Sequence, residues 1–465
     1  MTFRLRIRSF LPIAAAAITL LALPALAADV PDPLPDPDGE PADMSKPVQV
    51  YILMGQSNMI GSGKPSVLQG IAAEKYPYLV DDAGAWTVRK DVRNVFVMCS
   101  GNSPAKDYKN EWMTISGNIG PEMGIGHYVG HVTDAPVLIL KSCIGNRSLG
   151  WDLLPPGSEP YEHGGKTQPG YRGTPDDPGG DTGGDMSKGW YAGCQYDGDV
   201  AAAKKVLDNL DDYYPGAREY EVAGFFWWQG DKDMRNPAHF ERYEKNLIQL
   251  IKALRKDFDA PDALFVSASL GQTKKGSKGG DGQILDAMEA VSKSSDPELK
   301  GKVGFVYSHP LSKGGSSSGH YGGNPETYMN IGEAMGKAMV ELLKENAAGG
   351  EDETSAIPPL VPVPVDELPR YKVLSFKRSG NKVTAKVLVE ATPEKVPSEA
   401  QLAGIRQALA EKTEHQLLLW LYVLKMNYDG PPWATATTSD DGEPRVRRFD
   451  NRLPPPYATA VETPD

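Results

Sequence analysis

Along residues 48–346, short apolar runs alternate with longer segments in which apolar residues recur every three or four positions. The runs at 48–54, 94–98, 137–140, 222–228, 264–268 and 303–307 predict buried strands. Helices are predicted at 119–132, 199–210, 237–258, 283–292 and 325–346, the last with Asn324 as its cap and Pro325 at its first position. Because strands and helices alternate, we expect an α/β fold with a parallel sheet covered by helices on both faces.

Both ends of the chain differ from this pattern. Arg4, Arg6 and Arg8 precede an apolar run at 10–23 and a small-residue site at 25–27, which predicts a signal peptide over 1–27 and export to the periplasm or the outside. Residues 28–47 are rich in Pro and Asp and predict a disordered spacer. After signal cleavage no apolar run is long enough to span a membrane.

Beyond the α/β domain at 48–346, the sequence predicts a Pro-rich linker at 347–370 and a small α+β module at 371–428. In this module, Ser379, Gly380 and Asn381 predict the turn of a hairpin, and Ser398 with Gln401 predicts the start of a helix that continues toward Met426. A polar tail is expected at 429–465. None of these segments contains a pattern that predicts catalytic or ligand-binding residues.

The net charge and the cysteines of the chain argue against several classes of partner and ligand. The 465-residue chain has a formal charge of −12, and removing three Arg with residues 1–27 would give −12 − 3 = −15, which disfavours nucleic acid and anionic membranes as partners. Cys99, Cys143 and Cys194 allow one disulfide, whose pairing stays open. None has zinc-ligand spacing, and we expect neither a metal nor a cofactor. The sequence does not indicate an oligomeric state.

Candidate catalytic residues lie in the turns that follow the predicted strands and in one later loop. Ser57 follows the first strand directly, in a tight Gly-Gln-Ser-Asn-Met turn, which is how many hydrolases present a nucleophile. The alternative is a serine that only caps a helix. His320 lies in a Gly/Ser-rich loop and is suited to take a serine proton; His309 is a weaker rival, because it follows a strand directly and precedes Pro310.

A long irregular segment at 155–199 separates the third strand from the next helix. With neighbouring Trp151, it carries Tyr161, Tyr171, Trp190 and Tyr191, aromatic residues that suit sugar rings. We therefore expect a substrate-facing insertion rather than a disordered loop.

Four motifs carry a family resemblance: GQSNM at Ser57, SCIGNRS at Gly145, WWQGD at Gln229, and HYGGNPETYMNIGEAMGKAM at His320. Together they resemble the SGNH (GDSL-like) hydrolases, most closely the sialate O-acetylesterase-like and acetylxylan-esterase-like carbohydrate esterases. The resemblance implies a three-layer α/β/α flavodoxin-like fold. It also implies Ser57 as nucleophile, His320 as base, and an oxyanion hole formed by the N–H groups of Ser57 and Gly145 and the amide of Gln229.

The chain departs from this family pattern at Ser317, three residues before the histidine, where the family usually has an acid. Asp231, Asp233, Asp281 and Glu326 are the candidates for an orienting carboxylate; without one, a Ser-His dyad would act alone. The expected function is an exported serine esterase that removes O-acetyl groups from a carbohydrate, the sugar and the acetyl position being open. Alternatives are an esterase or lipase on other small acyl esters, and a catalytically silent carbohydrate-binding protein.

Overall fold

The structure is a computed structural model that describes residues 34–448, except 36, 38, 181–188, 355–367, 380–381, 391–395, 411–415, 423–433 and 439–443. The predicted signal peptide, most of the Pro-rich linker and the end of the polar tail lie outside the described residues. The chain divides into two compact units, residues 1–348 and 349–465.

The first unit contains a seven-stranded sheet in the order β3-β2-β4-β1-β7-β8-β9. All neighbouring strands are parallel except β2 and β3, which are antiparallel. The strands are β1 (Val48–Gly55), β2 (Arg89–Met98), β3 (Lys106–Met113), β4 (Val137–Ser142), β7 (Tyr220–Trp228), β8 (Leu264–Ala268) and β9 (Val303–Val306). Without the β2 and β3 pair at one edge, the order is 2-1-3-4-5, that of flavodoxin-like folds.

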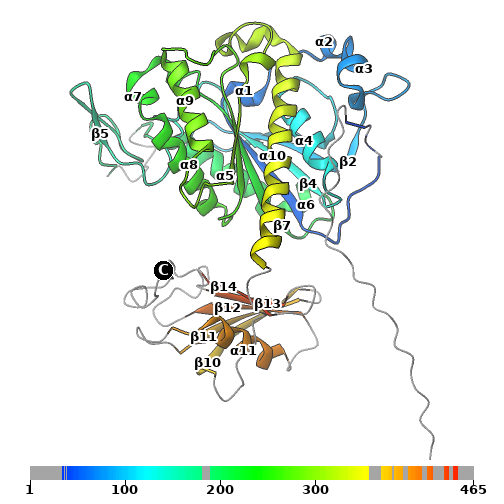
Figure 1. The fold of residues 1–465 in the computed structure, drawn as a ribbon, viewed down its shortest axis with the longest axis vertical. Helices are drawn as coiled ribbons and strands as arrows, with labels where there is room; N and C mark the ends of the chain where they lie inside the picture. Colours follow the sequence, from blue (N-terminus) through cyan, green and yellow to red (C-terminus); the bar gives the residue numbers. More distant parts are fainter. Residues whose placement is uncertain are drawn as a thin grey trace, which may run out of the picture. The chain divides into compact units, whose positions relative to one another are not determined.

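Helices cover both faces of this sheet, as the alternation of apolar residues along β1 shows. Val50 and Ile52 pack into one core, with α5 (Cys194–Asp208), α8 (Tyr243–Asp257) and α9 (Gly280–Ser292). Tyr51 and Leu53 pack into the other core, with α4 (Glu122–His131) and α10 (Pro325–Thr354). Figure 1 shows α8 and α9 on one side of the strands and α4 on the other. The predicted three-layer α/β/α fold is confirmed.

Several boundaries differ from the sequence-based expectation. The edge strand β3 was not predicted, because its sequence KDYKNEWM is mostly polar. The helix predicted over 237–258 is divided into α7 (Pro237–Phe240) and α8. The spacer at 28–47 is not disordered throughout: Leu34 is buried in the core, and the Asp43 N–H donates to the Asp134 carbonyl at 2.7 Å.

The remaining elements of the first unit are short. They are α1 (Ser57–Ile60), α2 (Pro65–Gln69), α3 (Ala72–Lys75), α6 (Leu210–Tyr213), the strands β5 (Tyr161–His163) and β6 (Lys166–Gln168), and the 3₁₀ turns η1 (Pro77–Leu79), η3 (Asp233–Arg235), η4 (His309–Leu311) and η5 (Ser317–Gly323). Strands β5 and β6 form a hairpin inside the insertion predicted at 155–199. Cys99, Cys143 and Cys194 are buried, and none of the three forms a disulfide in the described part of the chain. No helix among the described residues is long and apolar enough to cross a membrane.

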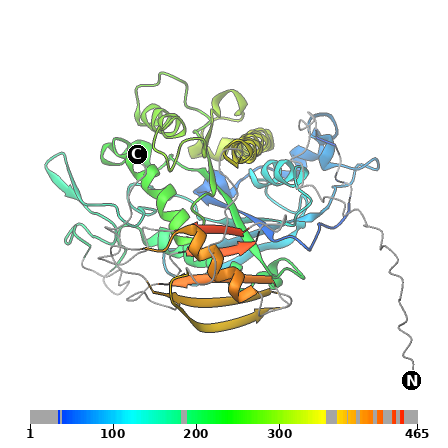
Figure 2. The same cartoon turned by 60° about the horizontal axis from the view of Figure 1, so that its bottom comes forward.

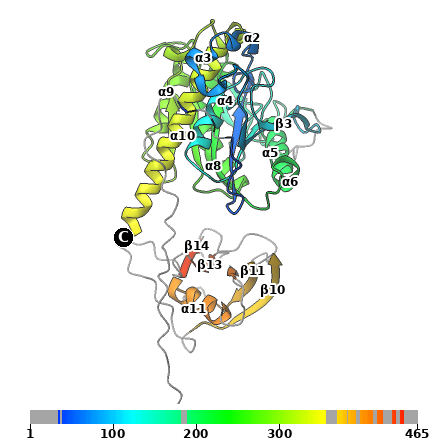
Figure 3. The same ribbon diagram turned by 90° about the vertical axis from the view of Figure 1, so that its right-hand side faces the viewer.

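The second unit is a five-stranded sheet in the order β10-β11-β12-β13-β14 with helix α11 (Glu399–Ala410) against it. Its strands are β10 (Tyr371–Ser379), β11 (Lys382–Val389), β12 (Gln416–Tyr422), β13 (Ala434–Thr438) and β14 (Pro444–Arg448). Leu402 and Ile405 of α11 share a buried core with Val387 and Leu419 of the sheet. Figures 2 and 3 show α11 lying along the strands of this unit. The hairpin predicted around Gly380 is confirmed by the antiparallel pairing of β10 and β11.

Two expectations for this unit were wrong. The helix predicted to run toward Met426 ends at Ala410, because the apolar run that follows is β12, which pairs in parallel with β11. The segment from 429 onward is not only a tail, since β13 and β14 extend the sheet beyond the predicted boundary at 428.

Candidate active site

The turn after β1 presents Ser57 at the carboxyl end of the central strand. Gly55 has φ 141°, and a Cβ atom there would lie 2.5 Å from the Trp228 carbonyl oxygen, so only glycine allows this exit. Ser57 is half-buried and begins α1. Its backbone N–H has no hydrogen-bond partner among the described residues. The turn can therefore offer both a hydroxyl and a free N–H to a ligand.

Gly145 lies directly beside this serine, in the turn that follows β4. A Cβ atom on Gly145 would be 3.5 Å from the Cβ of Ser57. The two turns meet because β4 and β1 are parallel neighbours, whose carboxyl ends share one edge of the sheet. In the described part of the chain, the Gly145 N–H also lacks a hydrogen-bond partner. Two unengaged backbone donors at one nucleophile are what an oxyanion hole requires.

Gln229 follows β7, the other neighbour of β1, but its side chain is completely buried. Its Nε2 donates to the Asp233 carboxylate, to the Arg147 carbonyl at 2.8 Å and to the Gln56 Oε1 at 3.3 Å. Its Oε1 accepts a hydrogen bond from the Tyr243 hydroxyl at 2.8 Å, which fixes the orientation of the amide. To reach a bound oxyanion, this amide would have to give up one of its present acceptors.

Asp233 is also completely buried, and both of its oxygens are engaged. They accept hydrogen bonds from the N–H groups of Leu149 at 2.9 Å and Gly150 at 2.8 Å, besides the Gln229 amide. Three N–H donors stabilise a buried carboxylate. Asp233 thus fixes the loop after β4, and the histidine that lies nearest to it is His239, whose Nδ1 is 3.5 Å from its Oδ1, and not His320.

His320 lies in η5, and its side chain is exposed. His320 and Tyr321 both adopt left-handed backbone conformations, with φ 48° and 52°, which non-glycine residues rarely do. Tyr321 is buried against Trp228 with ring centroids 5.8 Å apart, and the Tyr328 hydroxyl donates to the His320 carbonyl at 3.2 Å. Burial raises the pKa of the Tyr321 hydroxyl, which accepts a hydrogen bond from the Gly271 N–H.

The histidine loop and the serine turn are in contact. Helix α1 packs against η5, and the Lys64 N–H donates to the Gly323 carbonyl at 3.1 Å. The structure therefore brings the turns of Ser57, Gly145, Gln229 and His320 to one edge of the sheet.

Asp231 is the candidate acid that is bonded to the histidine loop. Its Oδ1 accepts a hydrogen bond from the Ser317 hydroxyl at 2.6 Å, and its Oδ2 pairs with Arg235 at 3.1 Å. Ser317 is buried and is also bonded to Gln272 through its N–H and its hydroxyl. The carboxylate of Asp231 thus lies against Ser317, the position where the family resemblance leads us to expect an acid.

The other candidates are engaged elsewhere. Glu326 pairs with Lys75 and Lys313, and the Lys75 hydrogen bond contributes most to lowering the pKa of this carboxylate. Asp281 accepts a hydrogen bond from the Ser277 hydroxyl at 3.1 Å. The Nδ1 of His309, the rival base, is 2.9 Å from the Gly271 carbonyl oxygen.

A buried ion pair below the serine turn was not predicted. Lys141, at the end of β4, pairs with Glu122 at 2.6 Å, and both side chains are almost completely buried. The same ammonium donates to the carbonyl of Ile60, the last residue of α1, at 2.8 Å. The sequence does contain a sign of this ion pair, because Lys141 directly follows the apolar run VLIL. A charged side chain at the end of a buried strand is costly unless it has a partner. Tyr243, whose hydroxyl donates to the Gln229 amide oxygen, was not predicted as a site residue either.

Comparison with known proteins identifies the enzyme class. Residues 180–341 match the family model described as "Carbohydrate esterase, sialic acid-specific acetylesterase". Over these residues the chain is similar to this family of carbohydrate esterases. This esterase is a carbohydrate O-acetylesterase, and hence a carboxylic ester hydrolase. The matched segment includes Gln229, Asp231 and His320, whereas Ser57 and Gly145 precede it.

Solved structures with low sequence identity are similar to this esterase. One is a protein from Arabidopsis thaliana, with 17% identity, a TM-score of 0.37 and coverage of 64% of this chain and 99% of that one. Another is a carbohydrate acetylesterase from Xanthomonas citri, with 14% identity, a TM-score of 0.40 and coverage of 71% and 60%. A third is NanS, with 15% identity, a TM-score of 0.31 and coverage of 57% and 78%. No curated protein sequence matches the chain.

Proposed function

We propose that this esterase is an exported serine hydrolase that removes acetyl groups from a carbohydrate through an acyl-serine intermediate. The observation that carries the proposal is the position of Gly145 beside Ser57, where a Cβ atom would come within 3.5 Å of the serine Cβ. This places two unengaged N–H donors and one hydroxyl at the same point of the sheet edge. The export step rests on the N-terminal sequence and is checked by finding a mature chain that begins near Ala28 in the extracytoplasmic fraction.

In the proposed mechanism, His320 takes the proton of the Ser57 hydroxyl as its oxygen attacks the acetyl carbonyl. The N–H groups of Ser57 and Gly145 stabilise the oxyanion of the tetrahedral intermediate. His320 then gives the proton to the leaving sugar oxygen, and a water molecule activated by the same histidine hydrolyses the acetyl-serine.

For the acid of this mechanism we choose Asp231 among the four candidates. Its hydrogen bond to Ser317 attaches it to the loop of His320, while Asp233, Asp281 and Glu326 are bound to other groups. A carboxylate near the base favours the imidazolium that forms when the serine proton is taken.

Replacement of the nucleophile tests the proposal directly. Ser57→Ala is expected to abolish acetate release from acetylated polysaccharides without changing the melting temperature, because the hydroxyl is needed only for the reaction. The control is Ser66→Ala on the exposed face of α2, which should keep normal rates. Near-normal acetate release by the Ser57→Ala enzyme would contradict the proposed serine mechanism.

Gln229 is proposed to position the oxyanion hole by holding the Arg147 carbonyl, two residues after Gly145. Gln229→Ala should lower kcat by roughly 10²-fold, as loss of an oxyanion donor does. It should also lower the melting temperature, because the buried Asp233 carboxylate and the Arg147 carbonyl lose a donor. A drop in kcat with an unchanged melting temperature would instead make Gln229 a direct oxyanion donor.

A further inference from the structure

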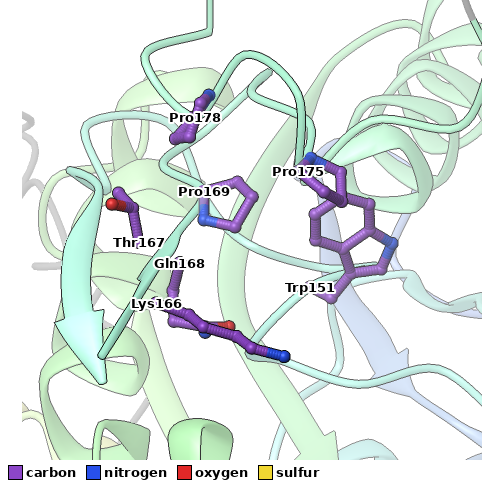
Figure 4. A pocket seen from close by; sticks show the side chains of 7 residues that line it. All are labelled: Trp151, Lys166, Thr167, Gln168, Pro169, Pro175 and Pro178. Atoms are coloured by element: carbon purple, nitrogen blue, oxygen red, sulfur yellow. The ribbon is translucent and has the colours of Figure 1, made fainter. Parts of the chain in front are cut away.

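A cavity lies in the insertion that follows β4. It has a volume of about 530 Å³, and Trp151, Lys166 and Gln168 line it together with Pro169, Pro175 and Pro178 (Figure 4). This volume is in the range of small-molecule sites, which are roughly 300–1,000 Å³. The size suits one sugar residue or a short oligosaccharide.

The walls of this cavity are held in place by the rest of the esterase domain. Trp151 follows Gly150, whose N–H is bound by Asp233, and the Trp151 carbonyl accepts a hydrogen bond from the Gly193 N–H at 2.7 Å. On the other side, the Arg242 guanidinium lies 4.3 Å from the ring centroid of Tyr161 in the β5 and β6 hairpin. A preformed cavity loses little entropy when a ligand binds.

The chemistry of the lining is mixed in a way that suits a sugar ring. The indole of Trp151 and the three proline rings provide apolar faces. Aromatic rings present large apolar faces to ligands, and the Gln168 amide can donate or accept hydrogen bonds. Lys166 extends from β6 across the cavity with its amine on the side of Trp151 in Figure 4.

Lys166 is the charged side chain of this lining. Its ammonium group is exposed, and no carboxylate of the described residues forms an ion pair with it. In a chain with a net charge of −12, an anionic ligand needs such a local cation.

We propose that this cavity binds an acidic sugar residue of the acetylated carbohydrate, with its ring against Trp151 and its carboxylate at Lys166. The inference rests on the proposed function for the link to the acetylated chain. Trp151 is six residues from Gly145, so the Cα atoms of these two residues are at most about 20 Å apart, the length of an extended chain. The occupant is then a unit of the same polysaccharide, a few residues from the acetylated one.

The first test compares acetylated oligosaccharides that contain uronic acids with neutral ones of equal length. Lys166→Gln is expected to raise KM for the acidic substrates about tenfold at unchanged kcat, because one charge-assisted contact is lost. KM for the neutral substrates and turnover of a small chromogenic acetyl ester should stay the same. The matched control is Lys90→Gln, which removes an exposed positive charge from β2.

The second test measures binding without turnover. Calorimetric titration of the Ser57→Ala protein with deacetylated acidic oligosaccharides should show binding that is weakened by Trp151→Leu and by Lys166→Gln. Equal KM values for Lys166→Gln and the parent enzyme on acidic substrates would overturn the assignment. An equal rise in KM on acidic and neutral substrates would also overturn it. A parent enzyme that fails to hydrolyse any acetyl ester would overturn the proposed function instead, while the titration would still report on the cavity.

Discussion

The Ser317 hydroxyl joins two parts of the proposed site, since it donates to Asp231 and accepts from the Gln272 amide. The family resemblance leads us to expect an acid at position 317, in the same turn as His320. In this chain a serine stands there and holds a carboxylate that comes from the turn after β7. In the proposed mechanism the acid thus comes from another strand end, where the Ser317 hydroxyl and the Arg235 guanidinium hold its two oxygens.

Exchange of these two residues tests that arrangement. Asp231→Ser should lower kcat by roughly 10²-fold, because the base loses its carboxylate. Ser317→Asp alone should also lower activity, because two carboxylates about one hydrogen bond apart cannot both be ionised. The double variant, with Asp at 317 and Ser at 231, should recover a substantial part of the rate.

The steady-state rates of the four proteins form a double-mutant cycle that measures this coupling. Asp281→Asn serves as the control, since Asp281 is bound to Ser277 and should not affect the rate. If the losses in kcat of the two single variants simply add in the double variant, the proposed exchange is contradicted. Asp231 would then not be the carboxylate that acts with His320.

At the level of elements, the short helix α1 depends on a group that belongs to β4. The Lys141 ammonium binds the last carbonyl of α1 and the Glu122 carboxylate in a site with almost no solvent exposure. A buried charge whose partner is removed is costly, typically about 3–5 kcal/mol.

Lys141→Met should therefore destabilise the esterase domain by about 3–5 kcal/mol in chemical denaturation, since Glu122 would stay buried without its cation. It should also lower kcat, because α1 carries Ser57 and loses its support at Ile60. The double variant Lys141→Met and Glu122→Gln should regain much of the stability but not the rate. A double variant as unstable as the single one would show that packing, and not the unpaired charge, causes the loss.

The sequence predicted the central elements because the physics that forms them is local. Strands such as β1 and β8 are apolar on both faces, which marks them in any window of a few residues. Gly55 and Ser57 could be placed at a strand end for the same reason. The contacts of Gln229 and Asp231 could not be predicted, because they join loops that are distant in sequence and meet only in the folded sheet. The strand β12 was misread because a short apolar run has no clear period.

At the level of the whole molecule, the proposed catalytic residues all lie in the first compact unit, residues 1–348. The second unit has its own core, built from α11 and its five-stranded sheet. A separate core is the property of a domain that can fold by itself.

A chain that ends after Thr354, the last residue of α10, should therefore keep the kcat of the full chain on a small chromogenic acetyl ester. The comparison is made at equal concentrations of folded protein, as judged by circular dichroism. A truncated protein that folds but loses turnover would show that the second unit contributes to the reaction. Lower activity on polysaccharides alone would assign it a role in substrate attachment.

The edge strand β3 has a consequence for behaviour at high concentration. The outer edge of a sheet exposes backbone groups that could pair with the strand of another molecule and start aggregation. Here that edge carries Lys106, Asp107, Lys109 and Glu111, and most of its side chains are exposed or half-buried. A second copy that approached in strand register would have to desolvate these charges. The same polar composition that makes β3 hard to predict from the sequence thus protects the sheet against edge-to-edge pairing at high protein concentration.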